Sequence, residues 1–512
     1  MNANFYAAIE AAGHNRGSSV LLETDDGRVF SRADAAGECA RLANLLLSLG
    51  AKRGDRVAVQ AEKSPQSLFL YLACLRSGLV YVPLNTAYQR DELSHFIGDA
   101  EPRVIVCHPG SVETMQELSA GRAQVLSLDE NGEGSLVQSA AGQAPEFPTV
   151  EMQADDLAVI IYTSGTTGRS KGAMVTHRNL ESNARTLVAY WDFSERDALL
   201  HALPIFHVHG LFVANHCALL SGAKLLWHRK FDAQQVLRDL PRATVMMGVP
   251  TFYTRLLAER GFTRELAKGI RLFVSGSAPL LADTFGEFRA RTEQPILERY
   301  GMSETGMISS NPLNGERRPG SVGFPLPGVS VRIAGDQDRI LPPGEIGGIQ
   351  VKGENVFSGY WRMPEKTRDE FTADGWFRTG DIGLIDGDGY LSIVGRAKDL
   401  IISGGFNVYP KEIELALNAL PGVAESAVIG VPHPDFGEAV TAVVVARKGS
   451  QLDPAEIIAE LRKNLANFKV PKQVYLVDDL PRNAMGKVQK AELRGRYRDI
   501  RGDLHALAKR KA

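Results

Sequence analysis

The chain has 512 residues, too many for one hydrophobic core, so two to four domains or subdomains are expected. Its 44% hydrophobic and 23% charged residues are typical of a globular protein and exclude a disordered or fibrous chain. The 58 basic and 60 acidic residues nearly cancel, so no charge excess indicates a nucleic-acid partner, and none is expected.

Segments that would target the chain to a membrane or for secretion are not expected. No run approaches the roughly 20 apolar residues of a membrane span, and residues 1–17 lack the basic and apolar regions of a signal peptide. Four scattered cysteines without CxxC spacing favour a reducing compartment over a zinc site or a disulfide frame. We therefore expect a cytoplasmic protein. The cysteines are Cys39, Cys74, Cys107 and Cys217.

Helical and strand patterns alternate through residues 1–150. Residues 32–50 have helical spacing, with Gly50 as the expected cap. Such alternation predicts parallel sheets covered by helices. A stretch with Gly, Ala and Pro at 139–150 is predicted to be a connector. Short buried strands are expected at 56–60, 79–84 and 103–107.

The alternation then resumes and changes character twice. From residue 320, glycine and proline become dense and short strands are expected; after 395–399 the pattern predicts a compact α+β unit. The expected fold is α/β. It has a large N-terminal domain of parallel and mixed sheets with a distorted β-barrel subdomain (1–394), a hinge (395–399) and a small mobile α+β domain (400–512). Segments of the resumed pattern are 158–163, 201–206, 224–228, 243–250, 270–279, 295–304, 328–334, 344–353, 390–396, 425–431, 441–448 and 455–466.

Residues 160–174, IIYTSGTTGRSKGAM, form a hydrophobic stub followed by a loop of Ser, Thr, Gly, Arg and Lys. A glycine-rich turn after a strand exposes several backbone N–H groups, which makes an anion site. Hydroxyls add donors, and Lys171 adds a charge suited to phosphate. The loop is not a Walker A motif, because Lys171 follows Gly168 by three residues and precedes Gly172. The alternative is a solvated strand-to-helix loop.

The string YTSGTTGRSKG resembles the phosphate loop of the acyl-adenylate-forming enzymes, which include acyl-CoA synthetases, peptide-synthetase adenylation domains and luciferases. The resemblance extends over essentially the whole chain, with its motifs in the family's order. The further matching segments are CLRSGLVYVPLN (74–85), LPIFHVHG (203–210), ERYGMSET (298–305), WFRTGDIG (376–383), GRAKDLIISGGFNVYPKEIE (395–414) and PRNAMGKVQK (481–490).

The resemblance implies a reaction in two steps that uses ATP, Mg²⁺ and coenzyme A (CoA). A carboxylate attacks the α-phosphate of ATP to give an acyl-adenylate and pyrophosphate, and a thiol then displaces AMP. Glu304 would hold Mg²⁺ with help from Thr163, since a hard carboxylate oxygen suits that ion; a surface carboxylate is the alternative. The phosphates would contact Thr163, Ser164, Gly165, Thr166, Thr167, Gly168 and Lys171.

The resemblance also implies how the nucleoside would be held. Tyr300 would stack on adenine, Asp381 would accept hydrogen bonds from both ribose hydroxyls, and Arg396 would reach the ribose or phosphates. A structural ion pair between Asp381 and an arginine is the alternative. Further contacts to the base and the adenylate would come from Ser277, Ala278, Pro279, Glu298, Gly301 and Ser303.

The C-terminal domain would supply one catalytic group and part of a tunnel. Lys487 would act in adenylate formation and leave by domain rotation, whereas Lys398 would be the hinge residue. A solvated lysine is the ordinary alternative for Lys487. Small residues would line the CoA tunnel, namely Ser403, Gly404 and Gly405. The chain ends about 25 residues after Lys487, so we expect a free thiol such as CoA, and a monomer or weak homo-oligomer.

The identity of the acid substrate is inferred from Arg299, a position at which many relatives have the first glycine of a GYGMTE pattern. An arginine would fill the acyl channel and offer a planar fork to a second carboxylate. Several stretches resemble malonyl-CoA synthetases, which implies malonate, with methylmalonate tolerated. An Arg299 that points outward or pairs with Glu298 or Glu304 is one alternative, and another short acid (acetate, propionate or succinate) is a second. A non-catalytic nucleotide or acyl-CoA sensor is a third. The acid pocket would include Arg299, His207, Ser277 and Met302, while His209 is expected to be structural.

Overall fold

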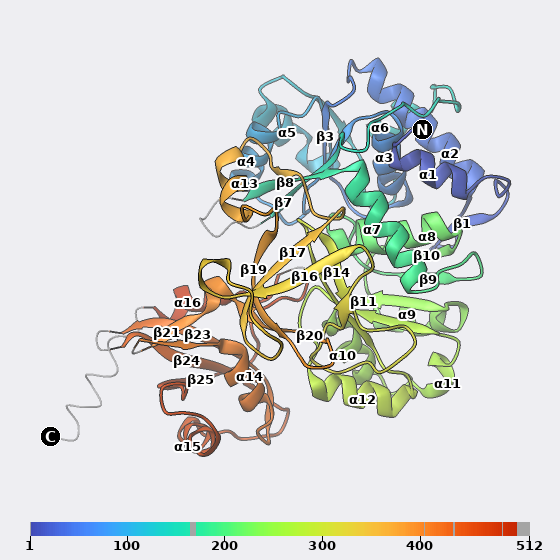
Figure 1. Ribbon diagram of the computed structural model, residues 1–512. Helices are drawn as coiled ribbons and strands as arrows, with labels where there is room; N and C mark the ends of the chain where they lie inside the picture. Colours follow the sequence, from blue (N-terminus) through green and yellow to red (C-terminus); the bar gives the residue numbers. More distant parts are fainter. Residues whose placement is uncertain (1, 164–169, 404, 434–435, 484, 499–512) are drawn as a thin grey trace. The chain divides into compact units, whose positions relative to one another are not determined.

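The computed structural model describes residues 2–163, 170–403, 405–433, 436–483 and 485–498. The chain divides into two compact units, a larger one of residues 1–331 and 351–377 and a smaller one of residues 332–350 and 378–512 (Figure 1). The expected α/β class, with large parallel and mixed sheets and a smaller C-terminal part, is confirmed. The expected hinge at 395–399 stays a prediction. Within the described ranges, no helix is long and apolar enough to cross a membrane.

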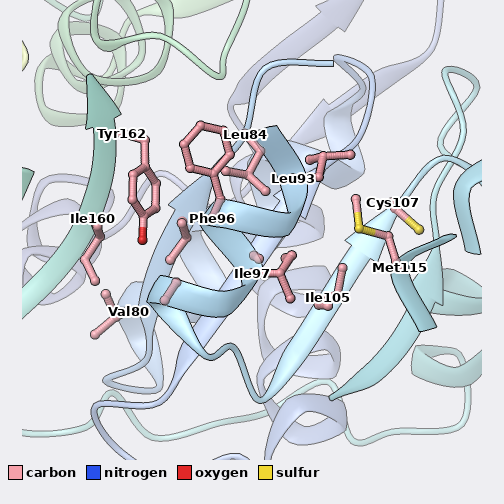
Figure 2. Packing of buried hydrophobic residues seen from close by; sticks show 13 residues of the cluster. Val80, Leu84, Leu93, Phe96, Ile97, Ile105, Cys107, Met115, Ile160 and Tyr162 are labelled. Atoms are coloured by element: carbon pink, nitrogen blue, oxygen red, sulfur yellow. The ribbon is translucent and has the colours of Figure 1, made fainter. Parts of the chain in front are cut away.

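A seven-stranded sheet contains most of the strands expected in the first 163 residues. Its strands β4, β3, β5 and β6 are parallel, β7 pairs parallel with β4, and β8 returns antiparallel along β7. The helix Arg90–Ala100 packs its apolar side on this sheet, where Phe96 and Tyr162 meet (Figure 2). In sheet order the strands are β18 (Gly359–Tyr360), β8 (Lys171–Thr176), β7 (Leu157–Thr163), β4 (Val80–Pro83), β3 (Arg56–Gln60), β5 (Val104–Cys107) and β6 (Gln124–Ser127).

A nine-stranded sheet forms the other half of the larger unit. Its central strands are parallel, and both edges are closed by antiparallel pairs. The carboxyl ends of parallel strands meet at one edge, where ligands of open α/β sheets bind. In sheet order the strands are β15 (Phe324–Pro325), β14 (Gly306–Ser310), β13 (Leu297–Met302), β12 (Leu272–Ser275), β11 (Val245–Gly248), β9 (Ala198–His201), β10 (Lys224–Trp227), β1 (Val20–Thr24) and β2 (Val29–Ser31).

Local sequence explains where several helices of the larger unit begin and end. Ser31 and Asp34 form a capping box at the start of α2, and Gly50 (φ 82°) follows its end as expected. Helices of this unit are α1 (Phe5–Ala12), α2 (Arg32–Ser48), α3 (Pro65–Arg76), α4 (Arg90–Ala100), α5 (Val112–Ser119), α6 (Ser135–Ala140), α7 (His177–Tyr190), α8 (Asn215–Ser221), α9 (Ala233–Asp239), α10 (Pro250–Ala258), α11 (Arg264–Ala267), α12 (Ala282–Thr292) and α13 (Pro364–Glu370).

The segment after β9 differs from the expectation. Residues 201–206 were predicted to continue the strand pattern, yet β9 ends at His201 and a π-helix (η2) follows at His209–Ala214. Gly210 lies so close to the carbonyl of Pro204 that a Cβ there would be 2.1 Å from its oxygen. The chain therefore folds back sharply here, which a hydrophobic pattern alone does not reveal.

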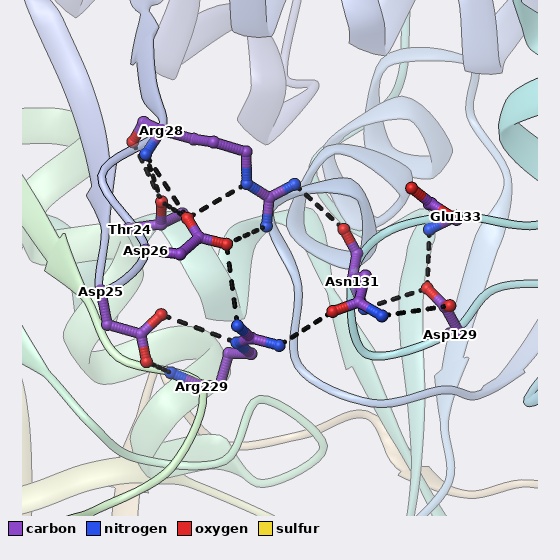
Figure 3. A network of polar contacts seen from close by, with 8 residues as sticks. All are labelled: Thr24, Asp25, Asp26, Arg28, Asp129, Asn131, Glu133 and Arg229. Carbon is purple, nitrogen blue, oxygen red and sulfur yellow. Dashed lines mark hydrogen bonds and ion pairs between the residues drawn. The ribbon is translucent and has the colours of Figure 1, made fainter.

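A polar network joins the edges of the two sheets (Figure 3). Arg28, in the β1–β2 turn, donates to the carbonyl of Asn131, which lies beyond β6. Arg229, just after β10, donates to the Asn131 side chain and also lies beside Asp25. Most of these groups are partly exposed, so the network contributes little to stability and mainly orients the connected segments relative to one another.

The smaller unit has an antiparallel core with one parallel strand. Val428, Val440 and Val444 lie fully buried where helices α14 and α15 contribute to the core. The five-stranded sheet has the order β22 (Phe406–Val408), β21 (Ile401–Ser403), β24 (Gly437–Ala446), β23 (Val423–His433), with β25 (Gln473–Val477) paired to β24. The helices are α14 (Pro410–Asn418), α15 (Pro454–Asn464) and α16 (Lys490–Tyr497).

The region expected to be a distorted barrel contains a four-stranded sheet. Three of its strands run through points at which the chain passes between the two units, near residues 331, 351 and 377. In sheet order the strands are β16 (Val329–Ala334), β17 (Gly347–Gly353), β19 (Phe377–Ile385) and β20 (Leu391–Arg396).

All four cysteines are buried free thiols. Burial raises the pKa of each, that of Cys107 to about 12. The expected absence of a disulfide frame agrees with these buried, unpaired side chains.

Candidate active site

A buried arginine forms the first part of the site. Arg299 lies on β13, in register with Ser310 of β14, and is only 4% exposed. Its Nε and Nη2 have no hydrogen-bond partner among the residues that the structure describes. Burial lowers the pKa of Arg299 to about 9, so the guanidinium stays charged at pH 7. Such a cation is costly to bury unless an anion pairs with it. The outward-pointing alternative is excluded.

The absence of a side chain at Gly276 leaves room for this guanidinium. A Cβ at Gly276 would lie 2.4 Å from Arg299 Cζ, so the backbone after β12 passes directly against the planar group. The next residue, Ser277, has φ 70°, which is strained for a residue with a side chain. Strain of this kind is concentrated at ligand sites.

A histidine of the π-helix lies beside this loop. His209 Nδ1 is 3.2 Å from Ser277 Oγ, while its Nε2 has no partner within the described part of the chain. Burial, and next the Arg299 charge, lower the pKa of His209 well below its usual range. His207 is half-buried, and its Nδ1 accepts from the backbone N–H of His209 at 3.3 Å. Arg299, Gly276, Ser277 and His209 are called the guanidinium site below.

The structure thus brings His209 to the site, although it was expected to be structural. The available signal was the His-Val-His spacing of 207–209. In an ordinary helix residues two apart point in different directions, so sequence gave no reason to place both near one ligand.

A second cluster surrounds Glu304. Thr163 Oγ1 donates to Glu304 Oε1 at 3.1 Å, and the hydroxyl of Tyr360 donates to the same oxygen at 3.2 Å. Lys171 Nζ lies 4.0 Å from the centre of the Tyr360 ring and 3.4 Å from Glu370 Oε1. Glu304, Thr163, Tyr360, Lys171 and Glu370 are called the carboxylate corner below. It brings together Glu304, Thr163 and Lys171 as expected, and adds Tyr360 and Glu370, which the sequence did not single out.

The carboxylate corner fits a hard cation. Burial raises the pKa of Glu304, whereas the hydroxyls of Thr163 and Tyr360 and the charge of Lys171 lower it. A further positive charge nearby would stabilise the ionised carboxylate. Within the described ranges no group of three or more His, Cys, Asp and Glu could hold a metal ion. One carboxylate with hydroxyls suits Mg²⁺, which keeps waters and shares phosphate oxygens instead of needing a full protein cage.

The strand between the two clusters carries other predicted residues. Tyr300 is buried, and Gly301 lies so close to Gly306 that a Cβ would be 2.2 Å from its carbonyl oxygen. Glu298 Oε1 accepts from the backbone of Gly320 at 3.1 Å. Ser303 and Glu304 line a small cavity of about 20 Å³ together with Phe212 and Val213 of the π-helix and nine other residues. Met302, Ser303 and Ala278 are half-buried, and Pro279 is exposed.

The smaller unit holds the remaining predicted residues. Arg396 Nε pairs with Asp381 Oδ1 at 2.9 Å across β19 and β20, which is the ion pair considered as the alternative for Asp381. Burial and the charge of Arg396 lower the pKa of Lys487 to about 8 and also lower that of Lys398. Ser403 is buried on β21, and Gly405 has φ 82°.

Some predicted residues lie outside the described part of the chain. These are Ser164, Gly165, Thr166, Thr167, Gly168 and Gly404.

The chain is similar to known proteins over most of its length. Residues 9–361 match the family described as AMP-binding enzyme, and residues 412–487 match the AMP-binding enzyme C-terminal domain. The crystal structure of ATP-bound MatB from Rhodopseudomonas palustris is 54% identical with a TM-score of 0.96, covering 98% of this chain and 100% of that chain.

Curated relatives act on several acids. A feruloyl-CoA synthase of an Amycolatopsis species is 38% identical over 475 residues, which are 92% of this chain and 94% of the relative. The malonate–CoA ligase of Arabidopsis thaliana is 34% identical over 518 residues, with 92% of this chain and 85% of the relative covered.

The matches span most of the chain, and the clusters lie within them. The chain therefore belongs to the AMP-binding enzyme family. By class it is an ATP-dependent, AMP-forming acid–CoA ligase.

Proposed function

We propose that this ligase converts malonate and CoA to malonyl-CoA, with methylmalonate as a tolerated variant. A malonate carboxylate oxygen attacks the α-phosphorus of ATP, the bond to the bridging oxygen breaks, and pyrophosphate leaves. The CoA thiolate then attacks the acyl carbon, and the bond to AMP breaks. The products are malonyl-CoA, AMP and pyrophosphate.

The observation that carries the proposal is the buried guanidinium of Arg299, whose Nε and Nη2 have no hydrogen-bond partner among the described residues. The far carboxylate of a short diacid would accept from Nε and Nη2, and His209 Nε2 offers a further group beside it. A monocarboxylate would leave the guanidinium unpaired, and sites built around a polar partner reject substrates that lack it. The similarity to a malonate–CoA ligase supports the same acid.

The carboxylate corner would serve the phosphate end. Glu304 and Thr163 would hold Mg²⁺, and Lys171 would exchange Glu370 for phosphate oxygens. The ion, when bound, would neutralise charge on the phosphates, which eases the approach of an anionic carboxylate. Asp381 would bind the ribose while remaining paired with Arg396, since a carboxylate has more acceptor sites than that single bond uses.

A panel of acids with a matched pair of variants tests the substrate. Arg299→Met keeps length and removes the charge; Arg32→Met is the control, because Arg32 is also buried and donates to the carbonyl of Ala223. Arg299→Met should lower kcat/KM for malonate about 1000-fold, in the range for breaking a buried charge pair. Values for propionate and butyrate should stay within about threefold or rise.

Two results would overturn the malonate proposal. One is a wild-type enzyme that forms thioesters from monocarboxylates better than from malonate. The other is an Arg299→Met enzyme that loses malonate and propionate activity equally, while Arg32→Met changes neither.

The smaller unit would act through Lys487 in the first step and then move away. Lys487→Ala should abolish adenylate formation but retain transfer of pre-made malonyl-adenylate to CoA. Measuring both half-reactions separately checks this, and equal loss of the two would contradict a domain rotation between them.

A further inference from the structure

A buried lysine joins the two sheets of the larger unit beneath the acid end of the site. Lys63 lies in the loop between β3 and α3 and is only 6% exposed. Its Nζ donates to His201 Nδ1 and to the His201 carbonyl oxygen, both at 2.8 Å. It also lies 4.2 Å from the centre of the Trp227 ring. Lys63 therefore extends from the seven-stranded sheet to the carboxyl ends of β9 and β10 in the nine-stranded sheet.

The contacts of His201 define its tautomer. His201 Nε2 lies 3.0 Å from the carbonyl oxygen of Gly210, which can only accept, so Nε2 carries the proton. Nδ1 is then the acceptor for Lys63. Both ring nitrogens of this fully buried imidazole are used, and the order of donation runs from Lys63 to His201 to Gly210.

This order does not depend on the charge of Lys63. Burial lowers its pKa well below the usual value, and Asp25 of the polar network in Figure 3 opposes that effect. A neutral amine still carries two hydrogens, enough for both bonds to His201. The imidazole of His228 also faces this region, with its Nε2 2.9 Å from Asp239 Oδ2.

The receiving carbonyl belongs to the π-helix. Gly210 is the second residue of His209–Ala214, and the preceding residue, His209, contacts Ser277 in the guanidinium site. The N–H of Leu211 also donates to the His207 carbonyl at 2.9 Å, which closes the same turn. Short π-helical segments are rare and need support from their surroundings. The bond from His201 gives such support from a rigid sheet.

We propose that Lys63 and His201 are positioning residues for the acid: they fix the first turn of the π-helix so that His209 stays beside Arg299. This inference rests on the proposed acid–CoA ligase function. Neither residue needs to touch substrate. Loosening the turn should displace the His209 imidazole, weaken acid binding, and leave the phosphate end of the site intact.

Substituting His201 by glutamine or asparagine tests its two ring-nitrogen hydrogen bonds one at a time. Glutamine places an amide N–H where Nε2 lies and keeps the bond to Gly210, whereas asparagine reaches only as far as Nδ1 and loses it. Lys63→Met keeps the length of the lysine and removes its donors. His177→Asn is the control, because His177 is also fully buried and its Nδ1 accepts from the backbone of Phe5 at 3.0 Å.

The test measures KM for acid and for ATP with the full chain, alongside thermal unfolding. His201→Asn and Lys63→Met should raise the acid KM roughly 10- to 100-fold and leave the ATP KM within about threefold. His201→Gln and His177→Asn should leave the acid KM within about threefold. A folded His201→Asn enzyme with unchanged acid KM would overturn the proposal, as would acid and ATP KM values that rise together.

Two provisions keep the outcome decisive. If wild type activates an acid other than malonate, the substrate proposal fails, but the KM comparison is made with that acid and still tests Lys63 and His201. If the variants do not fold, ¹⁵N-histidine spectra of wild type replace them. Saturating acid should shift the His201 signals and not those of His177, and an unmoved His201 at saturation would overturn the coupling.

Discussion

The guanidinium site and the carboxylate corner belong to the same unit, but they satisfy their charges in different ways. Arg299 is buried, and its Nε and Nη2 have no hydrogen-bond partner among the described residues. Glu304 and Lys171 already have partners of their own in Thr163, Tyr360 and Glu370.

This difference indicates how each of the two clusters discriminates between ligands. At the guanidinium site a ligand adds a missing partner, so the wrong ligand leaves a buried cation unpaired and is rejected strongly. At the carboxylate corner a ligand replaces internal partners, so binding is an exchange and the net gain is smaller. The acid should therefore be recognised sharply, and the phosphates held loosely enough for pyrophosphate to leave.

The largest expected effect comes from the carboxylate corner. Glu304→Gln keeps an oxygen to accept from Thr163 and Tyr360 but removes the negative charge. Adenylation should fall about 1000-fold for every acid alike, because the loss is at the phosphate end. Pyrophosphate release with malonate and with acetate measures this. A loss confined to malonate, or below tenfold, would show that the two ends are not separate.

The next effect belongs to the guanidinium site. The Cβ of Gly276→Ala would overlap Arg299 Cζ at 2.4 Å, and the flexible guanidinium would move. We expect the malonate KM to rise roughly 10- to 100-fold and the ATP KM to stay within about threefold, since misplacing a binding group is enough to lose it.

Gly286→Ala is the matched control for this substitution. Gly286 lies within α12 and has no atom within 4 Å of an added Cβ. Its substitution should leave both KM values unchanged and raise stability by about 0.5–1 kcal/mol, because alanine favours a helix. An unchanged malonate KM in the Gly276→Ala enzyme would show that Arg299 does not hold the acid.

The pH profile gives the third test, through Lys487 of the smaller unit. Its pKa is lowered to about 8, so the cation is present below pH 8 and is lost as pH rises through that value. Adenylation should halve near pH 8 and fall about tenfold by pH 9. Transfer from pre-made adenylate should not follow this curve, and Lys487→Arg should remove the fall. A flat profile for the wild-type enzyme would exclude a titrating Lys487.

The smallest effect concerns the internal partner of Lys171. Glu370→Gln removes a carboxylate that ATP must displace, so the ATP KM should fall about two- to fivefold with the acid KM unchanged. Glu365→Gln, on the same helix and exposed, is the control. A raised ATP KM would mean that Glu370 holds Lys171 in place for ATP instead of competing with it.

Sequence predicted the parts of the site that sit in continuous motifs. Thr163, Lys171, Glu304 and Arg299 were named from such strings. The strands that carry Thr163 and Arg299 formed as expected, whereas Lys171 begins a strand, Lys171–Thr176, that the polar loop pattern did not predict. Parallel strands bring such loops to one sheet edge, so local patterns were sufficient for the fold class and for these residues.

The remaining groups depend on contacts between distant segments. Tyr360 reaches Glu304 across 56 positions, and Lys63 reaches His201 across 138. His209 enters the site because the strand expected over 201–206 ends at His201 and a π-helix follows at His209–Ala214, a turn that the hydrophobic pattern of 201–206 does not reveal. Hydrophobic periodicity predicts which face of a helix or strand is buried, but not which polar group from a distant segment contacts that face.

The burial of all four cysteines has a practical consequence for watching this enzyme work. Maleimide dyes react with exposed thiolates, so the native chain should remain almost unlabelled. One cysteine introduced at exposed Glu365 and another at exposed Lys463 would then carry a fluorophore on each unit. Energy transfer between them would follow the separation of the units during each half-reaction, without removing any native residue that packs the core.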